Sequence, residues 1–324
     1  MSDLFYNKNG FDHEIVLGID ERRGIIDTTK PPFRWICSLE VEFPEPVINS
    51  LGVLENPGKN WESLPKGDKG CGSGLLISPN RVLTASHVIM GLKIVPGKTP
   101  DEKILKPVLA NRVHIIPGRD GKNNKSAFGK WKAVHIKINS TFCKKLIGNI
   151  EHINRNKILD ALSHDFAILE LVPKLNKNNQ SFHLGNKIGW WGKNEGYQIY
   201  PITSVFRKVL KDCQVKIGGY PGEKGKYPCS VLHLSTDVLV SSSPQLNGKQ
   251  KDLLLYLADT SAGMSGSPVW IENHKGNKCL IGIHTSFSTF KKVRSNHILK
   301  GNLGVLITDS IMVQLKNWGI RQHH

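Results

Sequence analysis

The sequence predicts an all-β protein of two antiparallel barrels followed by a C-terminal helix. Three observations support this fold class: short apolar runs bounded by turn residues, a length of 324 residues, and a histidine, an aspartate and a serine that stand at strand ends in that order. Because domains commonly contain about 100–150 residues, the chain is long enough for two barrels with sizeable cores. Its 31 glycines suit a fold with many turns.

The strand-like runs fall into two groups, which follow an N-terminal segment of residues 1–30. The first barrel is expected within residues 31–180, from the runs Trp35–Val41, Gly74–Ile77, Val82–Thr84, Arg112–Ile116, Trp131–Ile138 and Phe166–Leu171. The second is expected within residues 181–324, from the runs Gln198–Pro201, Gln214–Gly218, Ser230–Val240, Leu253–Leu257, Pro268–Ile271, Leu280–His284 and Val305–Ile307. The stretch Pro173–Tyr197, rich in Lys, Asn and Gly, is expected to connect them.

A helix is expected at the C-terminus. Met312, Leu315 and Trp318 recur there at helical spacing, and Asp309 is a residue that can cap its start. Such an apolar stripe is far more often core packing than a ligand site.

The most informative stretch is the glycine-rich turn Gly263-Met264-Ser265-Gly266, directly before the apolar run that begins at Pro268. An isolated Gly-x-Ser-Gly is a weak signal, because glycine and serine are common in any turn. It becomes a candidate nucleophile site only if partners for the serine occur elsewhere in the chain.

Two such partners stand upstream of Ser265. His87 follows the run Arg81–Thr84 after two small residues, and Asp165 stands at the mouth of the run that begins at Phe166. The chain order His, Asp, Ser is that of chymotrypsin-type enzymes, whereas subtilisins and α/β-hydrolases use other orders. Each residue alone has an ordinary structural explanation, but three strand-end positions in this order favour catalysis.

The chemistry needs each of these residue types. A serine hydroxyl is a poor nucleophile at neutral pH, so His87 would accept the proton of Ser265 and later give it to the leaving amine. Asp165 would hold the imidazole in the required tautomer. The backbone N–H groups of Gly263 and Ser265 would stabilise the oxyanion, and losing one such donor typically costs about 3 kcal/mol of barrier.

Several segments in one order resemble the bacterial glutamyl endopeptidases, a branch of the trypsin-like serine proteases. Besides the His87, Asp165 and Ser265 segments, the resemblance rests on Ile15–Arg22, Thr28–Arg34, Cys71–Ile77, Pro117–Gly121, Gly219–Gly222 and Ile281–His284. It covers the chain from about residue 15 to the end. It implies two six-stranded Greek-key barrels of the chymotrypsin type, with the active site in the cleft between them.

The resemblance also implies a substrate preference. In that family a threonine and a histidine line the pocket for a glutamate side chain, and Thr260 and His284 stand at these positions. Both side chains can donate a hydrogen bond to a carboxylate. Asp259 leaves open a trypsin-like preference for Lys or Arg, and His284 could instead be a packed core histidine.

The residues after His284 are implied to form a substrate-binding edge. Thr285 and Ser286 would pair with the extended backbone of the substrate, although an ordinary loop entrance is an equal alternative. The Thr285 hydroxyl could also reach Asp165.

Two positions depart from the patterns of related enzymes. Ala262 stands where the family usually has glycine, just before the oxyanion hole. Met264 stands where trypsin has the aspartate that pairs with a new N-terminus on activation. A propeptide of about 14 residues is one hypothesis, because a Glu-specific enzyme could cut its own Glu14-Ile15 bond, with the residues after it forming a strap; a short tail is the alternative.

The cysteines and the N-terminus leave the compartment open. Val88 stands where disulfide-bonded family members have a cysteine, so Cys71 is expected to lack its usual partner, while Cys213 and Cys229 could pair. No signal peptide or membrane span is evident. The resemblance favours secretion or export, but a cytoplasmic location or non-classical export stays possible.

The formal charge of +17 is spread over loops without aromatic interleaving, so no specific nucleic acid partner is expected. Neither a metal site nor a cofactor motif is evident. We expect a monomeric endopeptidase that acts on protein or peptide substrates. Two alternatives from other classes are a catalytically silent protease-like binding module and a basic scaffold protein.

Overall fold

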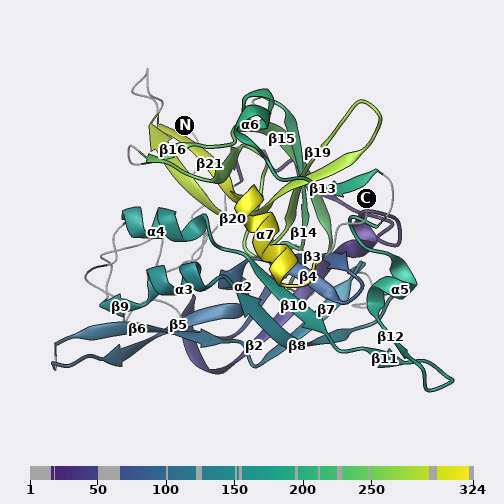
Figure 1. The fold of residues 1–324 in the computed structure, drawn as a ribbon, viewed down its shortest axis with the longest axis horizontal. Helices are drawn as coiled ribbons and strands as arrows, with labels where there is room; N and C mark the ends of the chain where they lie inside the picture. The colour runs from purple at the N-terminus through teal and green to yellow at the C-terminus, as the bar shows by residue number, and fades with distance from the viewer. Residues whose placement is uncertain are drawn as a thin grey trace.

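Two closed antiparallel β-barrels form the computed structural model, one in the lower half and one in the upper half of Figure 1. The described residues are 16–17, 19–49, 66–99, 101–121, 126–149, 152, 155–193, 196–210, 212–224, 228–246, 249–291 and 298–320. The hypothesis about the Glu14-Ile15 bond lies outside these residues.

The first barrel is a ring of six strands in the order β3, β4, β10, β8, β7 and β2, closed by the pairing of β2 with β3. Its strands are β2 (Ile36–Asn49), β3 (Lys66–Ser78), β4 (Arg81–Thr84), β7 (Arg112–Pro117), β8 (Trp131–Ile138) and β10 (Ala167–Leu171). A branch that the sequence analysis missed extends from β2 through β5 (Met90–Pro96), β6 (Lys103–Leu109) and β9 (Gly148–Asn149).

The second barrel is a ring in the order β15, β14, β19, β20, β21 and β18, closed by the pairing of β15 with β18. Its strands are β14 (Gln214–Gly219), β15 (His233–Ser241), β18 (Leu253–Tyr256), β19 (Pro268–Glu272), β20 (Lys278–Lys291) and β21 (Ile298–Leu306). Short β1 (Arg23–Gly24) adds to β15, and β13 (Tyr197–Ile199) runs parallel to β20. The prediction of two six-stranded barrels is therefore confirmed.

Large aromatic side chains link the two barrels. Trp191, which is fully buried, makes edge contacts with Trp35 at 6.4 Å and with Trp270 at 5.9 Å between ring centroids. Trp35 precedes the first strand of the first barrel, whereas Trp270 belongs to β19 of the second. Edge-to-face rings add about 0.5–1.5 kcal/mol per pair beyond the area they bury. This cluster holds the barrels in one arrangement.

The predicted connection between the barrels contains short elements of secondary structure. It holds the short pair β11 (Lys174–Leu175) and β12 (Ser181–Phe182), and the helix α5 (Leu184–Ile188). The remaining helices are α2 (Ser86–Ile89), α3 (Ser140–Leu146), α4 (Arg155–Leu162), α6 (Ser204–Val209) and α7 (Asp309–Asn317). Among the described residues, no helix is long and apolar enough to cross a membrane.

The C-terminal helix α7 follows the second barrel but packs against the first. Trp318 at its end lies 5.6 Å from Phe166, measured between ring centroids, and Asn139 donates to Gln314 at 2.9 Å. The predicted cap is wrong by one residue: the Thr308 side chain accepts from the Ile311 N–H, and Asp309 is the first helical residue. A hydroxyl one residue earlier can reach the free N–H groups of the first turn.

Candidate active site

The ends of β4 and β10 bring His87 and Asp165 together. These strands are antiparallel, with Ala167 opposite Thr84, so the turn after β4 lies beside the residues just before β10. The Nδ1 atom of His87 lies 2.6 Å from Oδ2 of Asp165, and the backbone N–H of His87 donates to Oδ1 at 2.9 Å. Since a carboxylate only accepts, Nδ1 carries the proton and Nε2 is left to act as a base.

Asp165 also receives a hydrogen bond from the second barrel. The hydroxyl of Thr285, in β20, donates to Oδ2 of Asp165, so the contact suggested by the sequence is present. Asp165 is fully buried and thus accepts from three donors. His87 is 6% exposed, and within the described residues its Nε2 atom has no hydrogen-bond partner. The imidazole is thus held at Nδ1, while its buried Nε2 atom keeps a lone pair that no described group binds.

Ser265 lies in a turn whose backbone requires glycine at positions 263 and 266. Gly263 and Gly266 have φ angles of 97° and 86°, which side chains rarely adopt. A Cβ atom on Gly266 would also lie 2.2 Å from the Ser73 carbonyl oxygen and 2.3 Å from Oγ1 of Thr84. Because Thr84 ends the strand before His87, this close approach seats the serine turn against the histidine turn.

The peptide before Gly263 is oriented by a hydrogen bond to a neighbouring loop. The Ala262 carbonyl accepts from the Gly222 N–H at 2.6 Å, and in a trans peptide the N–H of Gly263 points the opposite way. Within the described residues that N–H makes no hydrogen bond of its own. Only Asn179, Asp212 and Cys229 among the described non-glycine residues have positive φ, so the backbone accommodates alanine at position 262 without strain.

The predicted pocket residues are buried, and His284 is bonded to the serine turn, since its carbonyl accepts from the Gly266 N–H at 2.9 Å. Thr260 and His284 are both fully buried, and Oγ1 of Thr260 has no hydrogen-bond partner among the described residues. The Tyr256 hydroxyl lies 2.6 Å from Nδ1 of His284 and donates to the Leu303 carbonyl at 3.0 Å. A phenol has one proton, so both contacts are satisfied when Nδ1 donates to the Tyr256 oxygen. Tyr256 was not predicted as a site residue, because no local sequence pattern links it to His284, 28 residues further along the chain.

The model of the trypsin-like peptidase domain family matches residues 72–283, about two thirds of the chain. The chain belongs to the trypsin-like peptidase family. It is 24% identical over 306 residues to the glutamyl endopeptidase of Bacillus licheniformis, covering 94% of this chain and 68% of that protein. It is 22% identical over 303 residues to a Bacillus subtilis protein named extracellular metalloprotease, covering 94% and 69%.

Solved structures of similar fold support the architecture of this peptidase. A Glu endopeptidase in complex with MPD aligns with a TM-score of 0.55 at 18% identity, over 94% of this chain and 99% of that one. The protease Anisep from Arthrobacter nicotinovorans aligns with a TM-score of 0.54 at 13% identity, over 92% and 99%. At these identities the likeness establishes the chymotrypsin-like fold.

The N-terminal strap contacts Asp259, the residue before Thr260 of the candidate pocket. The two carboxylate oxygens of Asp259 accept from the Leu17 N–H at 2.7 Å and the Glu21 N–H at 3.0 Å. Burial is the main cause that raises the pKa of Asp259. The Arg22 guanidinium binds Ser261, next to Thr260, and forms an ion pair with Glu223 at 2.7 Å. These contacts tie the strap to the segment that leads to Gly263.

The expectation that Cys71 lacks a partner is wrong. Cys71 forms a disulfide with Cys229, across 158 residues, and Cys213 is a free thiol, so the alternative pairing of Cys213 with Cys229 is wrong as well. The fold brings the loop before β15 against β3, a proximity that chain spacing does not reveal. The Sγ atom of Cys229 lies 2.5 Å from where a Cβ of Gly263 would be, so the disulfide packs against the candidate oxyanion loop.

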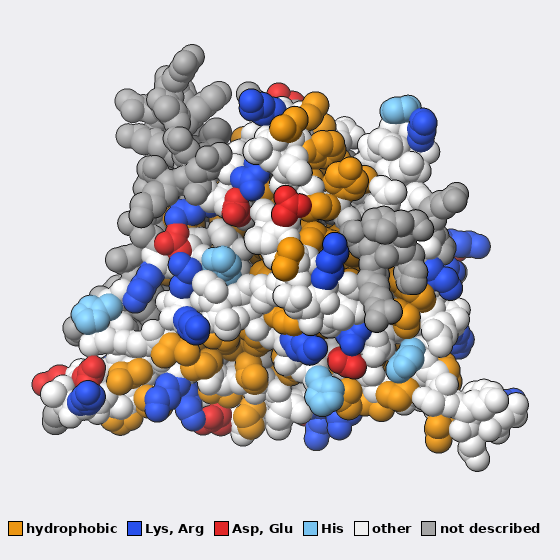
Figure 2. All heavy atoms as spheres, viewed as in Figure 1, with side chains coloured by type: hydrophobic (Ala, Val, Ile, Leu, Met, Phe, Trp, Pro, Cys, Tyr) orange, Lys and Arg blue, Asp and Glu red, His pale blue; other side chains and the backbone are white. Residues whose placement is uncertain are grey.

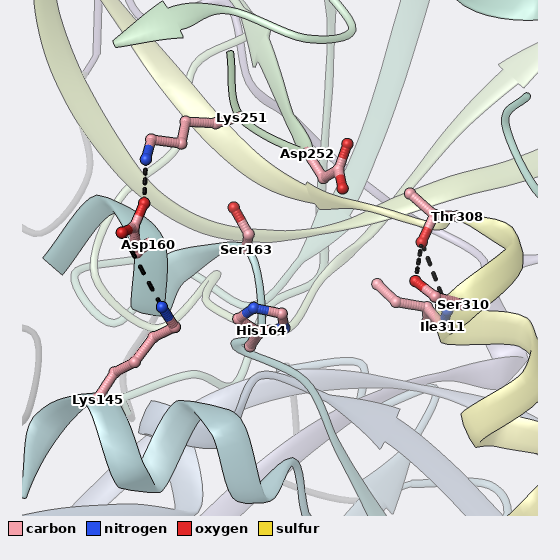
Figure 3. A pocket seen from close by; sticks show the side chains of 9 residues that line it. All are labelled: Lys145, Asp160, Ser163, His164, Lys251, Asp252, Thr308, Ser310 and Ile311. Atoms are coloured by element: carbon pink, nitrogen blue, oxygen red, sulfur yellow. Dashed lines mark hydrogen bonds and ion pairs between the residues drawn. The ribbon is translucent and has the colours of Figure 1, made fainter. Parts of the chain in front are cut away.

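A separate polar pocket of about 310 Å³ is lined in part by His164, the residue before Asp165 in the sequence (Figure 3). Asp160 lies between Lys251 and Lys145 there, bonded to the first and 3.9 Å from the second. Burial lowers the pKa of His164. The described residues hold no cluster of three or more His, Cys, Asp or Glu that could bind a metal.

The excess positive charge of the peptidase is dispersed on the face shown in Figure 2, where Lys and Arg side chains lie among acidic and neutral ones. Among the described residues, several cations are paired, as in Lys216–Glu272 and Lys130–Glu40, both at 2.6 Å. Exposed pairs of this kind contribute little to stability. On this face the charge forms no continuous stripe.

Proposed function

We propose that the chain is a serine endopeptidase that acts through an acyl-enzyme, with Ser265 as nucleophile and His87 as general base. The observation that carries the proposal is the buried His87–Asp165 pair, whose bonding directs the basic Nε2 atom away from Asp165. In this mechanism Nε2 takes the Ser265 proton as the hydroxyl attacks the peptide carbonyl. His87 then protonates the leaving amine, and water releases the acyl group by the same route.

Gly263 and Ser265 would supply the N–H groups that bind the oxyanion. The Ala262–Gly222 hydrogen bond supports this role, because it directs the Gly263 N–H away from the neighbouring loop. Donors that are oriented before reaction need no reorganisation as charge develops, which makes this kind of stabilisation effective.

The preferred residue on the acyl side of the scissile bond would be Glu, or Asp. The support is that Thr260 and His284 are buried, that the His284 carbonyl accepts from the Gly266 N–H of the serine turn, and that the Thr260 hydroxyl lacks a partner among the described residues. A substrate carboxylate would supply one. Thr285 and Ser286, which follow in β20, would bind the substrate backbone. Asp259 is a poor candidate for binding Lys or Arg, since both of its oxygens already accept from the strap.

The first test is labelling with a fluorophosphonate probe on the wild type and on Ser265→Ala. We expect labelling of the wild type at Ser265 and none of the variant. A silent binding module or a basic scaffold would leave the wild type unlabelled, and that result would overturn the proposal.

The second test is digestion of a mixed peptide library with mass-spectrometric readout, with Ser265→Ala as the matched control. Cuts after Glu, fewer after Asp and hardly any after the isosteric Gln would support the proposed pocket. Cuts mainly after Lys or Arg would support the peptidase activity but reject the proposed preference for Glu.

A further inference from the structure

Ser73 belongs to the first barrel, yet its hydrogen bonds reach the turn of Ser265 in the second. It lies in β3 and is fully buried. Its backbone N–H donates to the Ser265 carbonyl at 2.8 Å, and its hydroxyl donates to the Gly263 carbonyl at 2.9 Å. One residue thus binds the carbonyl groups of both candidate oxyanion residues.

The direction of the hydroxyl bond follows from its second partner. The Tyr220 N–H donates to the Ser73 hydroxyl at 2.9 Å, and a backbone N–H can only donate. The single hydroxyl proton is therefore available for the Gly263 carbonyl. Tyr220 can approach because Gly219 has no side chain: a Cβ there would lie 3.1 Å from the Ser73 hydroxyl and 1.9 Å from that of Ser267.

We propose that Ser73 is a positioning residue for the oxyanion hole. Gly263 has φ 97° and no side chain to restrict it, so the orientation of its N–H depends on what holds the two adjoining peptides. Gly222 holds the carbonyl before Gly263, and the Ser73 hydroxyl holds the carbonyl after it. Ser73 never touches substrate, and it acts through Gly263. The inference rests on the proposed function and adds a residue to it.

Ser73 is also tied to the turn that carries His87. The Thr84 hydroxyl donates to the Ser73 carbonyl at 2.7 Å, and Thr84 precedes His87 by three residues. All three polar groups of Ser73 are thus bonded, two toward the oxyanion loop and one toward the histidine turn. Ser73 keeps these two parts of the site in register.

The test is Ser73→Ala, which removes the hydroxyl and keeps the backbone bond to Ser265. We expect kcat to fall about 10- to 100-fold, less than the full loss of an oxyanion donor, with KM changed less than about threefold. Ser73→Cys should lie between Ser and Ala, because a thiol is a weak donor. Ser78→Ala is the matched control, since Ser78 lies in the same strand and its hydroxyl faces Asn80.

Two binding measurements separate positioning from general damage to the fold. Affinity for a peptide boronate, which forms a tetrahedral adduct with the serine, should fall by the same factor as kcat/KM. Substrate affinity, measured in the inactive Ser265→Ala background with and without Ser73→Ala, should stay constant. Equal weakening of both ligands, a change in KM alone, or a Ser73→Ala enzyme as fast as wild type would overturn the inference. A wild type that neither cleaves nor labels would instead reject the proposed function.

Discussion

The Asp165 carboxylate and the Thr260 hydroxyl, on opposite sides of the candidate site, differ in how completely they are bonded. On the acid–base side, the buried Asp165 carboxylate accepts from His87 twice and from Thr285 once. On the pocket side, the buried Thr260 hydroxyl has no partner among the described residues. An unsatisfied buried polar group costs roughly 1–3 kcal/mol. The Asp165 carboxylate is therefore fully bonded before substrate arrives, whereas the pocket side keeps a hydroxyl that a ligand could satisfy.

The acid–base side should therefore be the more sensitive to loss of one group. Asp165→Asn keeps the shape but replaces an acceptor oxygen by an amide donor, which favours the wrong histidine tautomer, and we expect kcat to fall about 10⁴-fold. Stopped assays on a Glu-containing peptide, with active-site titration, measure the change. Thr285→Val removes one outer bond and should cost far less. Equal losses in the two variants would show that the tautomer of His87 is not what Asp165 controls.

The candidate oxyanion loop packs against the Cys71–Cys229 disulfide, whereas the described residues show no disulfide at the acid–base side. Replacing Cys71 and Cys229 together by serine should lower the free energy of unfolding by about 2–4 kcal/mol, because the bridge closes a long loop in the unfolded chain. Chemical denaturation measures this. Cys213→Ser, at a free thiol, should shift stability by less than about 0.5 kcal/mol. A double variant as stable as wild type would contradict the bridge.

The Thr260 hydroxyl, which has no partner among the described residues, can be removed by a substitution that keeps nearly the same side-chain volume. In Thr260→Val we expect kcat/KM to fall about 10- to 100-fold on Glu substrates, because hydrogen bonds to charged groups are worth about 1.5–3 kcal/mol. Substrates with Gln should lose less, so the Glu-to-Gln ratio falls too. Parallel losses on both would assign Thr260 to packing. Thr236→Val, in β15 opposite Lys216, serves as the control.

The smallest effect is expected at the strap. The Arg22 guanidinium holds the pKa of Asp20 well below its usual range. The Asp20 carboxylate is protonated below about pH 4 in the unfolded chain, but only at a lower pH in the folded protein. This stabilisation is present above that pH and is lost as the pH falls toward the lowered pKa of the folded state. Asp20 is largely exposed, so its contribution should stay under about 1 kcal/mol. Thermal melts of wild type and Asp20→Asn should differ at pH 6 and converge toward pH 2.

Much of the fold was predictable because its signals are local. The runs Arg112–Ile116 and Trp131–Ile138 are bounded by turn residues and differ from the observed strands by at most one residue. The branch β5 and β6 was missed, since its lysines break up the alternation of apolar and polar residues. The cap at Thr308 was missed because Thr and Asp stand side by side, and both are good capping residues.

Local residue patterns were enough to predict the family, the strand-end positions of His87, Asp165 and Ser265, and the need for glycine around the serine. Tertiary structure alone decided which distant groups meet: Cys71 with Cys229, Tyr256 with His284, Asp259 with the strap, and Ser73 with the serine turn. The physical reason is that periodicity and turn chemistry act over a few neighbouring residues. Contacts between distant segments depend on how each sheet closes and how the two barrels pack, and local spacing carries no signal for either.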